Sequence, residues 1–427
     1  MTGDAVFAKC AWRLLPLLVL ANVVSLVDRV NVGMAALTMN RDLGFSASVY
    51  GFGAGVLFLG YALFQLPSNI ALHYIGARRW IGFLLAGWGA ASAACALIQG
   101  PVSFYILRLL VGAAEAGLVP GAVFYLSVWF PKAWLGRAYA IFAAGNVVAL
   151  IIGGPLASLF LTFDGIAGLR PWQWLFLIEG IAPVLLSVAV LLFLPDRPAS
   201  APFLSVEQKI HIDQRVERDD AGKNGDLLAA IRDPRVVLLG LAQGCFLLTG
   251  YGLSIWLPLV MQGVGFSNSA TGLLGGLISA VGLPVMYFWG RSSDRGGERI
   301  WHAATPVLVI CASLVTAAMM PASPFSILVL AIGATAAPCW LGPFYSLPPL
   351  FLTGRGLAGG IAAAISIGNL SGGFGGQYLI GVLRQQSGGY ATSFAVMAAG
   401  GLLAAIIVLS MGRALQPRSV TQTVLAQ

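Results

Sequence analysis

Long apolar segments recur along the whole chain, and each is about as long as a membrane is thick. A hydrocarbon core of roughly 30 Å needs about 20 apolar residues in a helix, and helices or closed barrels alone satisfy their backbone hydrogen bonds in lipid. Charged residues make up 9% of the 427 residues, whereas soluble globular domains carry about 25%. The sequence therefore predicts an all-α integral membrane protein with twelve transmembrane helices, at residues 14–38, 50–72, 79–99, 102–129, 136–161, 172–194, 235–262, 269–290, 300–320, 324–350, 355–382 and 391–413.

The basic residues are distributed unevenly between the connecting loops. With the N-terminus placed in the cytoplasm, Arg41, Arg170 and Arg384 fall outside. Those that fall inside are Lys9, Arg13, Arg78, Arg79, Lys132, Arg137, the basic residues from Arg197 to Arg235, Arg291, Arg295, Arg299, Arg355, Arg413 and Arg418. This bias is typical of membrane topology, so the net charge of +8 requires no nucleic-acid partner. We expect a multi-pass protein of the cell inner (cytoplasmic) membrane, embedded in the lipid bilayer, with both termini cytoplasmic.

One long polar connection divides the predicted spans into two sets of six. The two sets resemble copies, because Gly136-Arg137 opens the fifth span and Gly354-Arg355 opens the eleventh. The loops after the second and eighth spans are related by nearly the same offset along the chain. Transporters use such internal repeats to build a site between two bundles near the membrane midplane. We therefore expect an N-terminal six-helix bundle at 1–194, a cytoplasmic linker loop at 195–234 and a C-terminal six-helix bundle at 235–427.

An acid and a base stand side by side deep in the first span, at Asp28 and Arg29. A charge near the membrane centre costs about 2.5 to 3.5 kcal/mol on insertion scales, so it faces the protein interior and marks function. Neighbours on a helix point about 100° apart, so these two residues should serve different partners. We predict that Arg29 holds an anionic substrate, because its planar fork suits a carboxylate. Asp28 is predicted to carry or gate a proton.

Further ionisable residues within spans also fall in the first half. Arg108 and Glu115 are seven residues apart, hence on one face of the fourth span and about 10 Å apart along its axis. The depth of Asp28 lies between theirs, so we predict an Asp28–Arg108 ion pair with Glu115, the coupling acid, deeper in the same cavity. A static salt bridge that fixes helix packing is the alternative. Glu179 lies near the predicted outer end of the sixth span after two tryptophans, where we expect a structural role.

The matching depth of the second half is neutral. Polar and aromatic side chains predicted near mid-depth would shape the uncharged part of a ligand, and we expect such contacts, beside Arg29, from Asn146, Tyr251, Trp340 and Asn369. An unpaired amide is costly at this depth, which favours a ligand or water contact for the asparagines. Hydrogen bonds between helices remain the alternative for them, and anchoring at the membrane interface is the alternative for the aromatic residues.

Several function classes lack their signatures. The sequence shows no glycine-rich phosphate loop, zinc-ligand spacing or Ser-His-Asp set, so we expect no enzyme activity, no metal and no cofactor. Asp28 and Arg29 interrupt the first apolar run and no clear cleavage site follows, so this run is expected to be a membrane helix rather than a signal peptide. The cysteines occur singly in or beside apolar segments, as packing residues do: Cys10, Cys95, Cys245, Cys311 and Cys339.

Sequence motifs spread over nearly all of the chain carry a resemblance to a known family. They are Asp28-Arg29-Val30-Asn31-Val32-Gly33, Pro67-Ser68-Asn69, Gly76-Ala77-Arg78-Arg79-Trp80, Arg108 through Glu115-Ala116-Gly117 to Pro120-Gly121, Tyr125-Leu126, Trp129-Phe130-Pro131, Gly153-Gly154-Pro155, Glu179-Gly180, and Gly290 to Asp294-Arg295 with Glu298-Arg299. With these stretches the chain resembles the major facilitator superfamily. Within it, the chain is similar to the anion:cation symporter family of phthalate, tartrate, hexuronate and galactonate carriers.

The resemblance implies a fold of two pseudo-symmetric six-helix bundles that work by alternating access. It implies that Arg29 binds the substrate carboxylate and that Asp28 and Glu115 take part in proton coupling, with Arg108 in the same group. It also implies a gating motif in the loops after the second and eighth spans, formed by Gly76, Arg78, Arg79, Asp294, Arg295 and Arg299.

We therefore expect a monomeric, proton-coupled importer of a small organic anion, driven by the proton gradient. A proton-driven exporter of drugs or metabolites is the alternative, although the Gly-Pro stretch at Gly153-Gly154-Pro155 lacks the longer antiporter form and paired Arg and acidic residues suit an anionic cargo. A non-transporting sensor is the alternative of another class. It would need a large cytoplasmic extension, whereas the tail after Gly412 is short. Substrate flux into vesicles separates transporters from a sensor.

Overall fold

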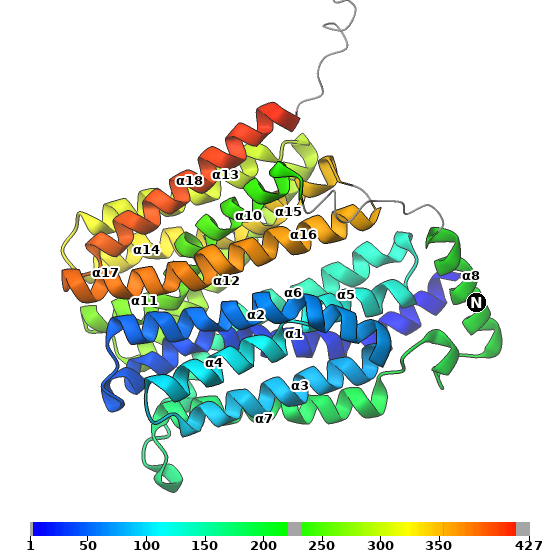
Figure 1. Cartoon of the computed structure of the whole chain (residues 1–427), viewed down its shortest axis with the longest axis horizontal. Helices are drawn as coiled ribbons and strands as arrows, with labels where there is room; N and C mark the ends of the chain where they lie inside the picture. The colour runs from blue at the N-terminus through cyan, green and yellow to red at the C-terminus, as the bar shows by residue number, and fades with distance from the viewer. Residues whose placement is uncertain (1–2, 221–231, 353, 416–427) are drawn as a thin grey trace, which may run out of the picture.

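The computed structural model describes residues 3–220, 232–352 and 354–415, and all regular elements in these ranges are helical (Figure 1). The helices of the first half and the polar connection are α1 (Gly3–Asp42), α2 (Ala47–Ile75), α3 (Ala77–Ala94), α4 (Pro101–Glu115), α5 (Leu118–Trp129), α6 (Lys132–Phe160), α7 (Pro171–Phe193) and α8 (Val206–Asp220). The second half contains α10 (Pro234–Phe246), η4 (Leu247–Tyr251), α11 (Gly252–Val264), α12 (Asn268–Gly296), α13 (Ile300–Ala318), α14 (Pro324–Ala336), η5 (Ala337–Trp340), α15 (Leu341–Tyr345), α16 (Gly354–Gly368), η7 (Asn369–Gly376), α17 (Gln377–Ser387) and α18 (Ala391–Leu415).

Among the described residues, 11 helical segments are long and apolar enough to cross a membrane. They match the expected spans except the one at 355–382, which corresponds to α16, η7 and α17 and is not among the 11. That segment is interrupted by the glycine-rich η7, which has π-helical geometry, as has η4 between α10 and α11. A π-helical stretch widens the helix locally and often occurs at functional sites.

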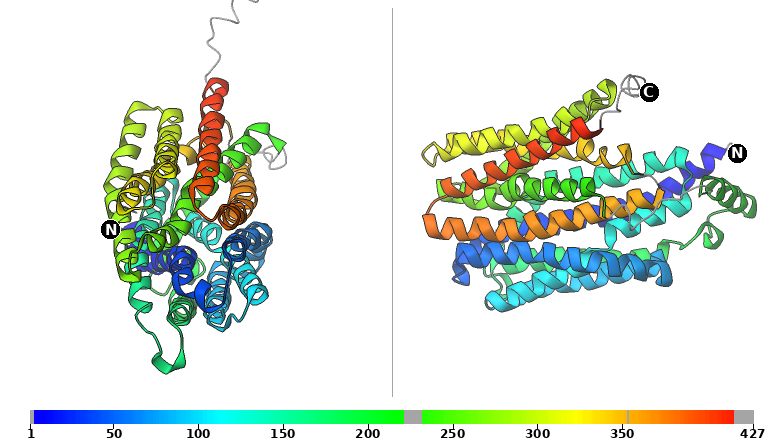
Figure 2. Two further views of the ribbon diagram at one scale, coloured as in Figure 1. Left: turned by 90° about the vertical axis from the view of Figure 1, so that its left-hand side faces the viewer. Right: turned by 45° about the horizontal axis from the view of Figure 1, so that its top comes forward.

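Many of the close helix pairs lie within one half. α3 packs on α7 and α2 on α4 in the first half, whereas α13 packs on α18 and α10 on α16 in the second. In Figure 1 most of the first half, coloured blue to green, lies below the second half, coloured green to red. α1 begins and α18 ends at the same end of the molecule (Figure 2), which we call the terminal end.

The internal repeat is visible in the backbone. Ser46 caps α2 by accepting a hydrogen bond from the amide of Val49, and Ser267, its counterpart in the second half, caps α12 in the same way with Ala270. At the other ends of these two helices, Gly76 has φ +90° and Gly297 has φ +64°. Residues with a side chain rarely adopt such positive φ values, so each turn into the next helix requires glycine.

Away from the terminal end, the two halves meet backbone to backbone. A Cβ atom on Gly51 of α2 would lie 2.6 Å from the carbonyl oxygen of Gln377 in α17. Across the other contact, a Cβ atom on Gly272 of α12 would lie 2.4 Å from the carbonyl oxygen of Gly154 in α6. Any larger side chain would push these helices apart, as in other glycine-mediated helix contacts in membranes.

Hydrogen bonds also join the halves in this region. Tyr50 Oη donates to the carbonyl of Ile255 at 3.3 Å, and Gln262 Nε2 donates to the carbonyl of Leu37 at 3.0 Å. We call this region, in which the glycine contacts and these hydrogen bonds seal the halves together, the closed end. The predicted topology places it on the outer face of the membrane.

Candidate functional site

Arg29 of α1 and Glu115 of α4 form an ion pair, with Nη2 and Oε1 2.7 Å apart. Arg29 exposes 20% of its side chain and Glu115 exposes 1%, so the arginine is the member that a ligand can reach. The guanidinium carbon also lies 5.0 Å from the ring centre of Tyr61, a cation–π contact. Ser25 Oγ donates a second hydrogen bond to Glu115 Oε1, while Oε2 is buried with no hydrogen-bond partner.

Asp28 does not form the expected ion pair with Arg108. Its carboxylate accepts hydrogen bonds from Trp88 Nε1 at 2.8 Å and from Ser92 Oγ, both on α3. These two donors are four residues apart and so share one face of α3. Arg108 acts on this carboxylate through its charge, but no hydrogen bond or ion pair joins the two side chains.

Glu179 belongs to the same buried group rather than to an exposed belt at the end of its helix, and its expected structural role stays a prediction. It lies about two turns inside α7 and is buried, and Asn31 Nδ2 of α1 donates to its Oε1. Its Oε2 is also buried without a hydrogen-bond partner, as is Nε of the fully buried Arg108. Arg108 interacts electrostatically with Glu179 as well as with Asp28.

The charges of this cluster do not balance. Its carboxyl groups belong to Asp28, Glu115 and Glu179, whereas its guanidinium groups belong to Arg29 and Arg108. With every group ionised, one negative charge would lack a counterpart. An uncompensated charge inside a membrane costs about 2.5 to 3.5 kcal/mol. A proton on one of the three carboxyl groups would balance the charges.

Asn146 and Tyr251 approach the cluster from different helices. Asn146 Oδ1 accepts a hydrogen bond at 2.9 Å from Asn22 Nδ2, which is seven residues from Arg29 and so on the same face of α1. Tyr251 ends η4, lies near Arg29 and Glu115, and has a buried hydroxyl without a hydrogen-bond partner. An unpaired polar atom in such a place suits a ligand or water.

Trp340 does not line the cluster in this conformation. Its ring stacks between Phe246 and Phe344, with ring centres 4.9 and 4.4 Å apart, and its Nε1 donates to Gln243 Oε1 at 3.1 Å. With both faces and its N–H engaged, Trp340 is a packing residue here, because depth in the membrane does not fix the direction of a side chain. Asn369 is buried at the start of η7.

The first copy of the gating motif fastens the turn between α2 and α3. The amide of Arg78 donates to Asp196 Oδ1 at 3.0 Å, and its guanidinium donates to the carbonyl of Leu191 at the end of α7. Gly76 supplies the positive φ of this turn, and Arg79 is exposed. The motif is therefore bound within the first half in this conformation.

The second copy lies between α12 and α13. Arg299 Nη1 lies 2.5 Å from Asp294 Oδ1 and donates to Ser293 Oγ at 3.0 Å. Glu298 accepts hydrogen bonds from the amides of Trp301 and His302. Burial raises the pKa of Glu298, but these donors and the His302 ring outweigh that effect and hold it below its usual value.

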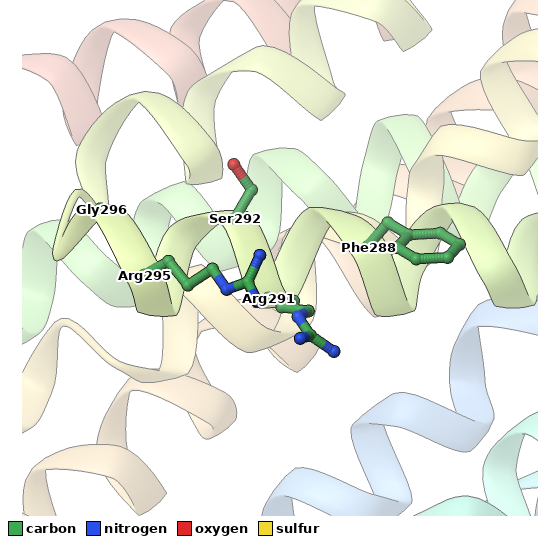
Figure 3. A pocket seen from close by; sticks show the side chains of 5 residues that line it. All are labelled: Phe288, Arg291, Ser292, Arg295 and Gly296. Atoms are coloured by element: carbon green, nitrogen blue, oxygen red, sulfur yellow. The ribbon is translucent and has the colours of Figure 1, made fainter.

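Arg295 lines a surface hollow of about 790 Å³ at this end of α12. The described residues that line it come from this one helix, and Figure 3 shows them along its surface: Phe288, Arg291, Ser292, Arg295 and Gly296. Arg291 and Arg295 are four residues apart, so they present two positive charges on one face at the terminal end. They give this surface a positive potential.

Several members of the cluster escaped the sequence analysis. Ser25, Asn22 and Asn31 all lie on α1, and the first two are four and seven residues before Arg29, a helical spacing that indicates a shared face. Trp88 and Ser92 show the same spacing in the third span. In each case a polar or aromatic residue within an apolar run was the available signal.

Comparison with known proteins agrees with this architecture. Residues 18–376 match the family model described as the Major Facilitator Superfamily. A protein of Agrobacterium vitis named "Putative tartrate transporter" is 38% identical over 97% of this chain and 93% of its own length. A "Quinolone resistance transporter" of Acinetobacter baumannii is 37% identical over 95% of this chain and 92% of its own.

Among solved structures, the chain is similar to a bacterial homologue of the human lysosomal transporter Spinster. That structure covers 96% of both chains with a TM-score of 0.74 at 17% identity, and it supports the fold. The fold of this family has twelve helices in the membrane. The chain belongs to the major facilitator superfamily of membrane transporters.

Proposed function

We propose that this transporter carries a small organic carboxylate together with a proton, as an importer of the anion:cation symporter type. The observation that carries the proposal is the 2.7 Å ion pair between Arg29 and Glu115, with the arginine partly exposed. A substrate carboxylate and the Glu115 carboxylate compete for the same guanidinium. Protonation of Glu115 removes that competition, so a proton and an anion bind cooperatively.

The charge balance supports the same coupling. The cluster already has more carboxyl groups than guanidinium groups, so an anion that entered alone would add a second uncompensated charge. An anion that enters with a proton leaves the balance unchanged. By linkage, substrate must tighten proton binding as much as the proton tightens substrate binding.

The closed end supports a path to Arg29 from the terminal end, because the glycine contacts seal the opposite side. If the protein lies in the cell inner membrane with both termini in the cytoplasm, this conformation would face inward. We propose further that the bundles at 1–194 and 235–427 rock about the site, joined by the loop at 195–234. The protein would act as a monomer, without a cofactor.

The 38% identity to the tartrate relative favours a hydroxylated carboxylate as substrate. Purified protein in liposomes, given an inward proton gradient and a panel of labelled carboxylates, tests the proposal. Gradient-dependent accumulation of one of them is the expected result. Uptake that ignores the gradient would refute proton coupling.

Export is the second candidate, because the quinolone resistance relative is almost equally similar. An exporter would exchange a proton for its cargo. The same liposomes loaded with a quinolone, and given a proton gradient in the exchange direction, would then lose it faster. Quinolone efflux without carboxylate accumulation would replace the first proposal by the second.

A further inference from the structure

A second pocket lies at the closed end, apart from the buried cluster. It has a volume of about 370 Å³ and lies between the two halves. Its walls come from α1, α2, α11 and α17 and the segment after α17. None of the described residues that line it is acidic; those with polar or aromatic side chains are Asn40, Ser46, Tyr50, Trp256, Arg384, Gln385 and Tyr390.

The lining of this pocket suits an anion that also carries a hydroxyl group. Arg384 is its positive charge, and the guanidinium carbon lies 4.6 Å from the ring centre of Tyr390. Asn40 Oδ1 is buried and has no hydrogen-bond partner, so it needs a donor such as a hydroxyl. Tyr50 and Trp256, in edge-to-face contact at 4.9 Å, supply an apolar wall.

The pocket exists because the halves meet. Tyr50 of the first half donates to the carbonyl of Ile255 in the second at 3.3 Å, and the amide of Ser48 donates to Gln385 Oε1 at 3.2 Å. If the closed end opened, Asn40 and Arg384 would separate, because they belong to different halves. A ligand that contacts both residues therefore binds the closed conformation alone.

We infer that this pocket binds a small hydroxycarboxylate and that the bound ligand fastens the closed end. Its carboxylate meets Arg384 and its hydroxyl donates to Asn40. By linkage, such a ligand shifts the population toward conformations with this end closed. A high concentration of the ligand on that side of the membrane thus slows opening. The inference is independent of whether the protein imports or exports its cargo.

The experiment uses full-length protein in lipid nanodiscs and L-tartrate as the probe. Spin labels at Thr162→Cys and Ser269→Cys, exposed positions on opposite halves at the closed end and outside the pocket lining, report its opening by pulsed EPR. Cys245 is replaced by alanine because the other cysteines are buried. Arg29→Gln in the same chain removes the response of the buried cluster, so the outcome does not depend on the proposed transport mechanism.

Tartrate should raise the short-distance population in this background, and Arg384→Gln should weaken its apparent affinity at least about tenfold, the effect of one lost charge-assisted hydrogen bond. Arg41→Gln is the matched control, since Arg41 is an exposed arginine at the same end and does not line the pocket. Succinate, which has no hydroxyl groups, should bind more weakly. An unchanged tartrate response in Arg384→Gln would overturn the inference. So would the absence of any tartrate response in the protein with Arg384 intact, whether residue 29 is arginine or glutamine.

Discussion

The two halves of the molecule treat buried polar groups differently. In the second half they are neutral and largely paired with one another: Trp340 with Gln243, Trp256 with Gln377, and Thr249 with the carbonyl of Met397. In the first half they include charged groups, and several buried atoms of these have no hydrogen-bond partner: Arg29 Nε, Arg108 Nε, Glu115 Oε2 and Glu179 Oε2. Unused hydrogen-bonding capacity of this kind is costly unless a ligand, a proton or water uses it. The difference indicates that the buried cluster of ionisable groups belongs to the first half, whereas most buried polar groups of the second half hold its helices together.

Of the substitutions that test this difference between the halves, Glu115→Gln should have the largest effect on transport. The variant mimics the protonated acid, so it should still exchange labelled for unlabelled substrate across liposomes. It should accumulate nothing under a proton gradient, because no proton is carried. Asp164→Asn, an exposed acid of the same half, is the control and should accumulate normally. Concentrative, pH-dependent uptake by Glu115→Gln would move the coupling acid to Asp28 or Glu179.

Arg29→Lys should have the second-largest effect, a loss of apparent affinity for the substrate anion. Lysine keeps the charge but loses the planar fork, and one lost hydrogen bond to a charged group is worth roughly 1.5 to 3 kcal/mol. The apparent affinity for the anion should therefore fall about 10- to 100-fold. Initial uptake rates over a range of substrate concentrations measure it, with Arg41→Lys as the control. An unchanged apparent affinity would show that Arg29 does not bind the carboxylate.

A pair of double-mutant cycles should sharpen the account of Asp28. Asp28→Asn combined with Trp88→Phe should show a coupling of about 1 to 3 kcal/mol, because the two side chains are in contact. Asp28→Asn combined with Arg108→Gln should show less, because those two groups interact without a hydrogen bond. Thermal unfolding in detergent measures both cycles. A larger coupling for the Arg108 cycle would restore the direct ion pair.

Trp340→Phe should have the smallest effect, and one of another kind. It leaves the buried oxygen of Gln243 without its donor, at a cost of about 1 to 3 kcal/mol in stability. The dependence of uptake on pH should not change, since Trp340 lies outside the buried cluster of charged residues. Thermal unfolding and a pH profile of uptake give both readouts. A shifted pH profile would make the second half part of the charge-binding site.

Composition and spacing gave the all-helical fold, the membrane location and the repeat, because lipid imposes spans of fixed length. Arg29 and Glu115 were both recognisable in the sequence as charged residues within apolar spans, and the structure brings them together. Their pairing did not follow. A helix that is apolar all round gives no periodic signal for the direction in which its residues point. The sequence alone therefore predicts an Asp28–Arg108 pair and places Trp340 in the site. The donors of α3 that satisfy Asp28 decide the first case, and the stacking of Phe246 and Phe344 decides the second.

The backbone contacts at Gly51 and Gly272 have a consequence for the speed of the conformational cycle. Where glycines meet, separation of the halves exposes little apolar side-chain surface to water. The free-energy cost of that exposure is therefore small, because it amounts to about 25 cal/mol for each Å² of apolar surface. Glycine has no side chain whose rotation the contact restricts, so little side-chain conformational entropy is gained when the halves separate. The two conformations of this end then lie close in free energy, and a ligand with a modest preference for one of them suffices to change the balance. Bulky apolar residues at these positions would fit only if the helices moved apart. The larger apolar contact would then stabilise the closed conformation and slow its opening in every transport cycle.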